Sequence, residues 1–357
     1  MPAPPDLLHG LLEVAQFLQS RHRELGELVC VGVLPLIPLL LAGLHAGRND
    51  VRVRRFALRA AVAVVLFYAG VYTAIIASNV VHPQDWDLVT YWLYGLVAAH
   101  GVNFYDPEHY RRLSDGIATS PEIVAFVVNV GFNLPPPSIF LVLPLGWFSL
   151  HTASVLWYVP LVATAAVDVT LLTRLFVGRS RAATLFVAAL VLALRPAMAT
   201  AWFGQTNFLV LLLLLLFWRD RDTLRAGVWF GLGMLVKPVF ATLGLYVVIA
   251  RRWRVAAGAA GVLAALSLVT IAVFGWETFA TYFVNGPVTR TPFGAYTEEI
   301  NQSLLAVILR ATHAEPTPGS PVTHPLFVAV GLTLVAITTW RVHRAHHAGD
   351  DDLAVAL

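Results

Sequence analysis

The sequence is short of charge, of cysteine and of the motifs by which soluble enzymes hold phosphate or metal. Only 13% of its 357 residues are charged and 58% are hydrophobic, a balance far from that of soluble domains. The single cysteine, Cys30, excludes a disulfide within the chain. The sequence contains no Gly-rich phosphate loop, CxxC pair or HExxH motif. It therefore favours neither a soluble nucleotide-binding enzyme nor a zinc protein.

What the sequence has instead is a series of long apolar runs. Each is near the roughly 20 residues that cross a bilayer core as a helix, and helices satisfy their own backbone polar groups there. We expect an all-α polytopic membrane protein with about 8–10 spans, built as a single membrane domain over residues 1–357. The runs lie at 28–46, 57–81, 152–173, 182–198, 205–218, 226–250, 255–275 and 325–340.

Basic clusters separate the apolar runs and predict the orientation of the chain. Positive residues collect on the cytoplasmic side of membrane spans, so we expect these clusters inside and the polar, non-basic segments outside. The net charge of +3 then reflects topology rather than a nucleic-acid partner. The clusters are Arg48–Arg59, Arg174–Arg181, Arg219–Arg225, Arg251–Arg254 and Arg341–Arg344. The outer segments are a first external loop at 82–134 with interfacial helices, tips at 201–207 and 237–238, and a second loop at 276–324.

Two stretches are expected to cross the membrane only in part. Residues 226–250 have the length of one crossing but lie between two basic clusters, and Pro238 permits two half-depth helices that meet at Lys237. A single crossing is the alternative. Four prolines between residues 135 and 144 predict a broken or re-entrant helix, which would have to line a cavity rather than face lipid.

The segment 85–110 places acids beside aromatic and aliphatic residues. Asp85 and Asp87 stand at the start of an expected helix, where carboxylates cap backbone N–H groups and suit the helix dipole. A capping role explains one of these two acids but does not require both. Asp106 and Glu108 are interpreted as caps or solvated loop charges. The apolar residues recur at the spacing of an amphipathic helix on the outer membrane surface: Trp86, Leu88, Val89, Trp92, Leu93, Leu96 and Val97.

Lys237 is a charged residue within an apolar stretch, twelve residues after Arg225 and fourteen before Arg251. An intramembrane cation is costly and by default functional, and an ammonium suits an anionic phosphate. The alternative is a side chain that snorkels to the outer interface.

Further polar residues lie at the outer end of the 182–198 run. Arg195 precedes a proline there, and together with Gln205 and Asn207 it would form a polar rim. Helix capping and interhelical hydrogen bonding explain Gln205 and Asn207 equally well. For Asp168, six residues before Arg174, a structural role at the interface is favoured over a functional one.

Four groups of motifs, in the order in which they occur, resemble glycosyltransferase family 87, whose members are integral membrane enzymes of the type-C fold. The similarity covers about residues 80–310. The chain departs from the family pattern at Asn133-Leu134, where an aromatic residue is common, and we expect fewer C-terminal spans than the family pattern has. The motifs are Asp87-Leu-Val-Thr-Tyr91 with Gly101-Val-Asn-Phe-Tyr105-Asp106, Pro135-Pro136-Pro137 with Pro144-Leu145, Phe203-Gly204-Gln205-Thr-Asn207, and Lys237-Pro238 with Asn301-Gln302-Ser303.

The resemblance implies a polyprenyl-phosphate sugar donor, with mannose favoured and arabinofuranose next. The sugar would be transferred on the outer face of the cell membrane to a lipid-linked or polymeric glycan, in the cell-envelope synthesis of actinobacteria. Asp87 is then the expected catalytic carboxylate, with Asp85 as the alternative. Expected substrate contacts are Tyr91, Gln205, Asn207, Asn301 and Gln302.

The chemistry of the residues agrees with that implication. Sugar transfer from a lipid phosphate needs a base for the acceptor hydroxyl and positive charge for the leaving phosphate. Asp87 would supply the base, and Lys237, helped by Arg195 or Arg290, the charge, without a metal ion or another cofactor. A single displacement would invert the anomeric configuration. The main alternative is a transporter or flippase of a lipid-linked sugar, which also needs intramembrane charge and broken helices; a non-catalytic scaffold would leave Lys237 unexplained.

Overall fold

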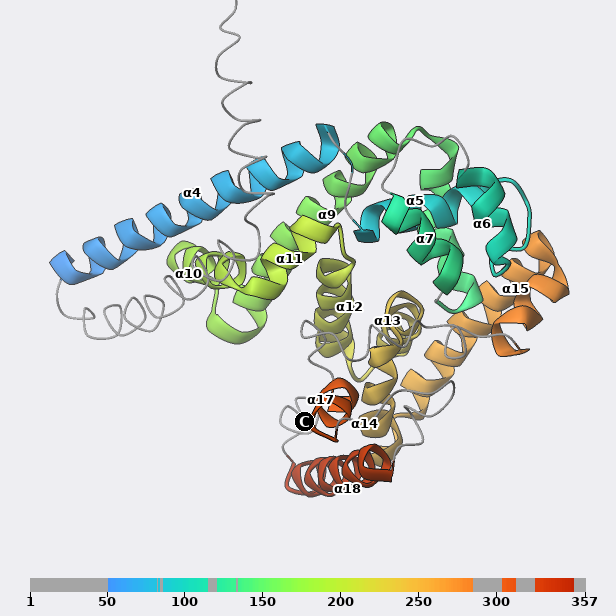
Figure 1. Ribbon diagram of the computed structural model, residues 1–357. Coiled ribbons are helices and arrows are strands. Elements are labelled where there is room, and N and C mark those ends of the chain that lie inside the picture. Colours follow the sequence, from blue (N-terminus) through green and yellow to red (C-terminus); the bar gives the residue numbers. More distant parts are fainter. Residues whose placement is uncertain are drawn as a thin grey trace, which may run out of the picture. The chain divides into compact units, whose positions relative to one another are not determined.

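The computed structural model describes residues 51–81, 83, 86–114, 121–132, 134–284, 304–312 and 325–349, and every regular element in these ranges is a helix (Figure 1). Within them, four helices are long and apolar enough to cross a membrane. They are α4 (Val51–Val81), α9 (Leu150–Leu172) with its continuation η3 (Thr173–Val177), α15 (Trp253–Val284) and α18 (Pro325–His347). The all-α, multi-pass class predicted from the sequence is confirmed.

A fifth crossing is formed if one bent pair counts as a single span. Helices α10 (Arg181–Ala193) and α11 (Arg195–Phe203) meet at 66° across Leu194. Leu194 is extended, and the next helix starts with a proline among its first two residues, which suits a helix beginning but not its interior. Other expected crossings appear as shorter helices, and the expected run at 28–46 lies outside the described residues.

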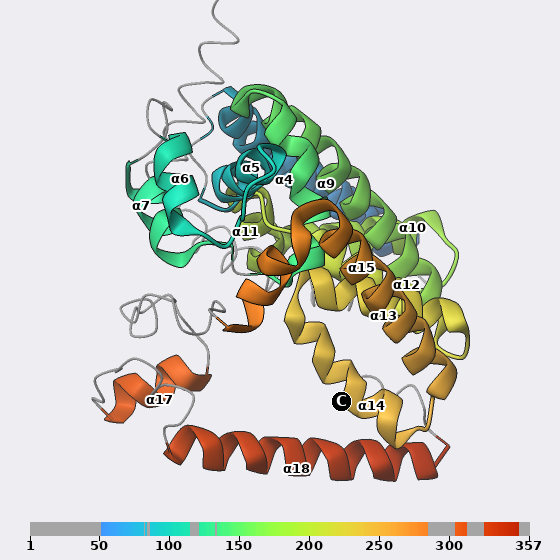
Figure 2. The ribbon, with the colours of Figure 1, turned by 90° about the vertical axis from the view of Figure 1, so that its right-hand side faces the viewer.

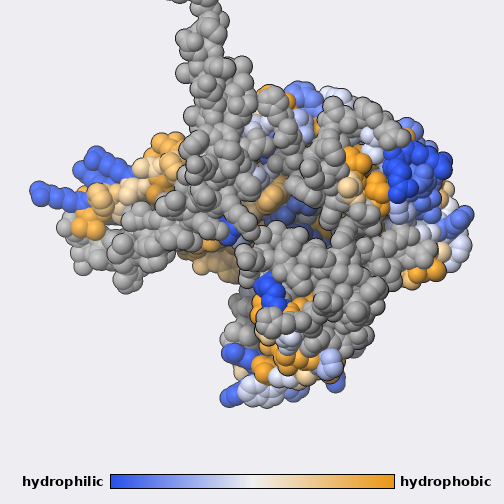
Figure 3. Space-filling view, in the orientation of Figure 1, coloured by the Kyte–Doolittle hydropathy of each residue, from blue (hydrophilic) through white to orange (hydrophobic). Residues whose placement is uncertain are grey.

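The long helices expose large apolar side chains, as helices that face lipid do. Examples are Phe56 and Leu66 on α4, Leu268 on α15 and Leu332 on α18. Figure 3 shows hydrophobic side chains along α4, whereas hydrophilic side chains gather over α6 (Pro107–Ser114). The exposed apolar surface is what a bilayer would cover.

The described residues form two compact units. The first contains the described parts of Met1–Trp92 and Trp147–Leu215, and the second those of Leu93–Gly146 and Leu216–Leu357. In the first unit, α4 packs against α9, α10 and α11. Ala57 and Ala61 of α4 are buried against Phe186 of α10, and such small residues let membrane helices approach closely.

In the second unit, α13 (Leu224–Val236) crosses α15 at glycines. A Cβ on Gly227 would lie 2.2 Å from the Val255 carbonyl oxygen, and one on Gly258 would lie 2.5 Å from that of Leu224. No side chain fits at either position, so the two backbones pack directly together.

The expected break at Lys237 is confirmed. Helix α13 ends at Val236, Lys237 is extended, and the chain resumes as η4 (Pro238–Thr242) and α14 (Leu243–Ile249). The proline-rich stretch is also broken, into η1 (Pro136–Ser138), α8 (Ile139–Val142) and η2 (Leu143–Trp147). The Ser138 hydroxyl donates to the Leu235 carbonyl at 2.5 Å, which ties this short segment to α13.

The expected helix at residues 86–97 is present as α5 (Trp86–Ala99), with Asp87 in its first turn. Its predicted one-sided burial is wrong. Thr90, Tyr94 and Ala98 are buried as fully as the apolar residues of the predicted face. A helix that is apolar on nearly all sides is buried rather than laid on a surface. On α5, the ring of Tyr94 adds apolar surface to the side of the helix that the predicted face did not include.

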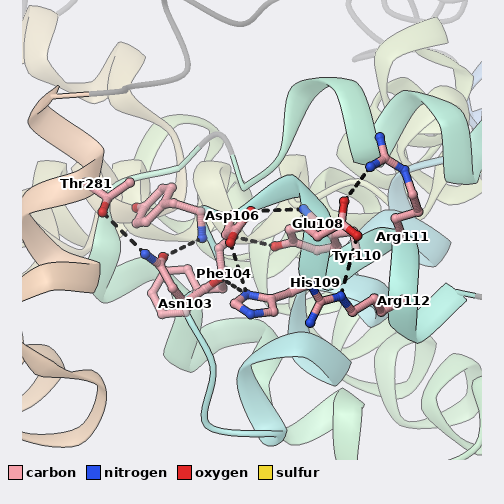
Figure 4. A network of polar contacts seen from close by, with 10 residues as sticks. Asn103, Phe104, Asp106, Glu108, His109, Tyr110, Arg111, Arg112 and Thr281 are labelled. Atoms are coloured by element: carbon pink, nitrogen blue, oxygen red, sulfur yellow. Dashed lines mark hydrogen bonds and ion pairs between the residues drawn. The ribbon is translucent and has the colours of Figure 1, made fainter.

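Helices α6 and α7 (Pro121–Val130) lie side by side (Figure 2). The turn before α6 is held by a polar network (Figure 4). The Glu108 backbone N–H donates to Asp106 Oδ1 at 3.0 Å, and the His109 ring nitrogen Nδ1 lies 3.0 Å from the Asn103 carbonyl. Glu108 also forms ion pairs with Arg111 and Arg112. The interpretation of Asp106 as a cap is confirmed. Glu108 is not a loop charge, because it lies in the first turn of α6 and pairs with arginines of the same helix.

Candidate active site

The candidate site is built on the turn between α11 and α12 (Asn207–Asp220), and this turn lies in the first unit. Gly204 ends α11 in the left-handed conformation, with φ 68° and ψ 29°, which favours glycine. A Cβ at this position would lie 2.9 Å from the Leu88 Cβ of α5. The glycine therefore lets the turn pack directly against the first turns of α5.

The turn brings Gln205 to Asp87. Gln205 Nε2 donates to Asp87 Oδ2 at 2.9 Å, and Asn207 Nδ2 donates to Gln205 Oε1 at 2.7 Å. Asn207 Nδ2 also donates to the Thr200 hydroxyl at 2.9 Å. Because the Gln205 oxygen accepts from Asn207, its NH₂ group is the end that faces the carboxylate. The network thus aims one amide at one oxygen of a half-buried acid.

Tyr91 lies one helical turn after Asp87, on the same side of α5. Its ring centroid is 5.3 Å from that of Trp157. Burial, and secondly the negative charge of Asp87, raise the pKa of the Tyr91 hydroxyl well above its usual value. Tyr91 therefore stays protonated at neutral pH.

Two buried polar residues of other helices hold the end of α11. Asn79 of α4 is 2% exposed, and its Nδ2 donates to the Trp202 carbonyl at 2.9 Å and to the Tyr158 hydroxyl oxygen at 2.7 Å. The Tyr158 hydroxyl in turn donates to the Ala201 carbonyl at 3.0 Å. The last carbonyls of a helix have no partner within it, so these contacts satisfy the end of α11 and hold it against α4 and α9.

The turn itself is held by Trp157, whose Nε1 donates to the Gly204 carbonyl at 2.7 Å. No motif or spacing in the sequence predicts these contacts of Asn79, Trp157 and Tyr158. A signal was present, because Asn79 is an amide inside an apolar run of membrane-spanning length, where polar side chains usually bind something.

The structure brings together some of the expected site residues and not others. Asp87, Gln205 and Asn207 form one network, and Tyr91 lies beside it. Arg195 begins α11 and so lies about 12 Å along that nine-residue helix from its other end at Phe203. Lys237 belongs to the second unit, where it is half-buried at the break after α13.

The remaining expected residues lie outside the described ranges, so their roles stay predictions, as do those of Arg195 and Lys237. They are Asp85, Arg290, Asn301 and Gln302. Among the residues that the structure describes, no three His, Cys, Asp or Glu side chains are grouped as ligands for a metal ion. Metal-free transfer also stays a prediction.

Long apolar helices, and a carboxylate of α5 held by the turn that follows a bent helix pair, define a multi-pass membrane protein with a polar site at the end of that pair. The chain belongs to glycosyltransferase family 87, because the sequence model of that family matches residues 132–357. The matched region contains Gln205 and Asn207 and begins after Asp87. No solved structure matches the chain.

A curated relative is similar over part of the chain. It is the polyprenol-phosphate-mannose-dependent alpha-(1-2)-phosphatidylinositol mannoside mannosyltransferase of Mycobacterium tuberculosis, 28% identical over 243 residues. The similarity covers 64% of this chain and 56% of the relative, so the chain spans little more than half the length of that protein.

Proposed function

We propose that this protein is a membrane glycosyltransferase that takes its sugar from a polyprenyl-phosphate donor. Membership of family 87 supports glycosyl transfer, and the name of the mycobacterial relative supports a polyprenol-phosphate donor. The observation that carries the proposal is the oriented carboxylate of Asp87, to which Gln205 donates at 2.9 Å. Transfer of a sugar to an acceptor hydroxyl requires a general base that is held in position to take the hydroxyl proton.

Asp87 acts as the general base in the proposed reaction. Its carboxylate takes the proton of an acceptor hydroxyl as the hydroxyl oxygen bonds to the anomeric carbon. The bond between that carbon and the phosphate oxygen breaks, and polyprenyl phosphate leaves with the electron pair. The single displacement inverts the configuration at the anomeric carbon. Gln205 keeps the carboxylate turned toward the acceptor, while Asn207 and Tyr91 contact the substrate.

Positive charge stabilises the leaving phosphate in this scheme, without a metal ion. Lys237 is the only lysine in the chain, and it stands at a helix break between two apolar helices. A cation at such a position is energetically costly, and its presence therefore favours a functional role. Arg195 and Arg290 are the proposed helpers, and Asn301 and Gln302 complete the substrate contacts.

The finer assignments rest on the relative and on the charge pattern. We favour mannose as the sugar, with arabinofuranose next, because the relative is named as mannose-dependent. Its acceptor is a phosphatidylinositol mannoside, which supports a glycolipid acceptor here. The basic clusters support a reaction on the extracytoplasmic side.

The test is transfer by the purified protein in sealed proteoliposomes. Radiolabelled polyprenyl-phosphate mannose and polyprenyl-phosphate arabinofuranose are supplied in parallel with a glycolipid extract, and protein-free liposomes serve as the control. The proposal expects label in a new glycolipid, more from mannose than from arabinofuranose. Movement of intact donor across the bilayer without any new glycolipid would instead identify a flippase.

A further inference from the structure

The first unit has a cavity at its other end, where α9 and η3 turn into α10. Its volume is about 410 Å³, and three arginines line it, Arg174, Arg179 and Arg181, together with four residues that carry hydroxyl groups. The turn itself is short, because η3 ends at Val177 and α10 begins at Arg181.

The three arginines have no acid to neutralise them. Across the described ranges, none of them forms an ion pair or a hydrogen bond. The acid nearest to them in the sequence, Asp168, lies on α9 before Arg174. It is fully buried and does not line the cavity. Uncompensated guanidinium groups around one concave site favour an anion.

The start of α10 adds to this preference. A helix N-terminus carries partial positive charge and is stabilised by acids, yet the first turn of α10 has no acidic residue and begins with Arg181. An anion in the cavity would offset both the dipole and the arginine beside it.

The hydroxyl groups differ in what they can offer an anion. Each threonine hydroxyl donates to the carbonyl four residues before it: Thr170 to Ala166 at 2.9 Å, Thr173 to Val169 at 2.7 Å and Thr184 to Ser180 at 3.1 Å. The Ser180 oxygen accepts from the Ala183 backbone N–H at 3.0 Å, so its own proton is left to donate. The cavity thus presents three guanidinium groups and one hydroxyl donor.

The cavity lies far from the Asp87 site along the same helix. Seventeen residues of α9 and η3 separate Trp157 from Arg174, which is about 25 Å, close to the thickness of a bilayer core. Two apolar side chains, Phe176 and Val177, are exposed next to the arginines. Apolar side chains beside arginines at the end of a membrane-spanning helix match a lipid, with acyl chains beside the headgroup.

We propose that the cavity formed by Arg174, Arg179, Ser180 and Arg181 binds the phosphate of an anionic membrane phospholipid. A soluble phosphate compound is also an anion but would gain nothing from the apolar side chains beside the cavity. The bound lipid serves as a fixed contact for the end of α9 opposite the candidate active site.

The test uses the full-length protein purified in neutral-detergent micelles doped with phosphatidylglycerol or phosphatidylcholine. Bound lipid is counted by native mass spectrometry and the thermal midpoint is measured in the same samples. Phosphatidylglycerol should be retained and should raise the midpoint relative to phosphatidylcholine. Arg179→Gln with Arg181→Gln should weaken retention by about tenfold or more, because charge-assisted hydrogen bonds to phosphate are lost.

Arg341→Gln with Arg344→Gln is the matched control. It removes the same charge from another basic cluster predicted for the same membrane side, and it should retain phosphatidylglycerol as the parent does. Unaltered retention by the Arg179/Arg181 variant, or equal loss in the control, overturns the proposal. A midpoint rise with free glycerol 3-phosphate equal to that with phosphatidylglycerol would identify a soluble phosphate and also overturn it.

Discussion

Gln205 donates its side-chain amide to the Asp87 carboxylate at 2.9 Å, although 118 residues separate the two in the chain. The contact joins the first turn of a buried helix to the turn at the end of a bent helix pair. The contact depends on Gly204, which lets the turn approach α5. It also depends on Asn79 and Tyr158, which hold the last carbonyls of α11.

Asp87→Asn should lower the rate of sugar transfer strongly while the fold and donor binding are kept. Loss of a general base costs about 10²–10⁴ in rate, and the amide has nearly the shape of the acid. Turnover and donor affinity are measured separately on the purified variant.

Asp106→Asn is the control for that variant, because Asp106 is 47% exposed and acts as a helix cap. It should keep full activity. If Asp87→Asn is fully active and Asp85→Asn is not, the base is two residues earlier. Full activity in both rules out a catalytic acid at this helix start.

Gln205→Glu should shift the pH dependence of transfer. A second carboxylate within hydrogen-bond distance of Asp87 favours proton binding by the pair. A protonated base is inactive, so the acid limb of the rate profile should move to higher pH, with turnover partly restored by alkali. Gln205→Leu removes the donor without adding charge, and it should lower turnover without this shift. An unchanged acid limb in Gln205→Glu would show that the pair does not carry the proton.

Gly204→Ala should destabilise the protein and lower turnover. The left-handed conformation costs a residue with a Cβ about 1–2 kcal/mol, and this Cβ would also meet Leu88 at 2.9 Å. The readouts are the thermal midpoint and the rate of transfer. Gly70→Ala in α4 is the matched control, because a Cβ there meets nothing within 4 Å. Equal effects of the two changes would contradict the role of Gly204.

Asn79→Leu and Tyr158→Phe should have non-additive effects on stability and on turnover. Both side chains donate to the Ala201 carbonyl and they bond to each other, so the double variant should differ from the sum by about 0.5 kcal/mol or more. Thr73→Val in α4 replaces Asn79→Leu in the control cycle, because its hydroxyl bonds only within the helix. The effects of Thr73→Val and Tyr158→Phe should be strictly additive. Strict additivity of Asn79→Leu and Tyr158→Phe would contradict the prediction.

A polyprenyl phosphate should protect Lys237 from acylation. As the only lysine, it is the single side-chain target of an amine-reactive reagent, and its modification can be followed by peptide mass spectrometry. Neutral polyprenol has the same chain without the charge and should not protect. Equal modification rates with and without polyprenyl phosphate would contradict phosphate binding and favour the alternative, in which Lys237 snorkels to the interface.

Much of the fold follows from local patterns. The apolar runs predict the membrane helices, and Pro238 and the prolines at 135–144 predict the breaks that the structure shows. The turn at residues 204–206, within the expected tip at 201–207, and the position of Asp87 in the first turn of α5 are also local features.

What could not be predicted depends on contacts between distant segments. Charge patterns assign Asp87 and Gln205 to one side of the membrane, but side chains that meet across 118 residues have no signature in either local sequence. The same holds for Asn79, which reaches Trp202 across 123 residues. The burial of Tyr94 and Ala98 on α5 is likewise decided by the elements around the helix, not by its own spacing.

Gly95 of α5 and Gly146 of η2 let two backbones touch. A Cβ on Gly146 would lie 2.1 Å from the Gly95 carbonyl oxygen, and one on Gly95 would lie 2.2 Å from the Val142 carbonyl oxygen. A larger residue at either position would therefore have to push α5 and η2 apart, so the two glycines fix the distance at which these helices can approach each other.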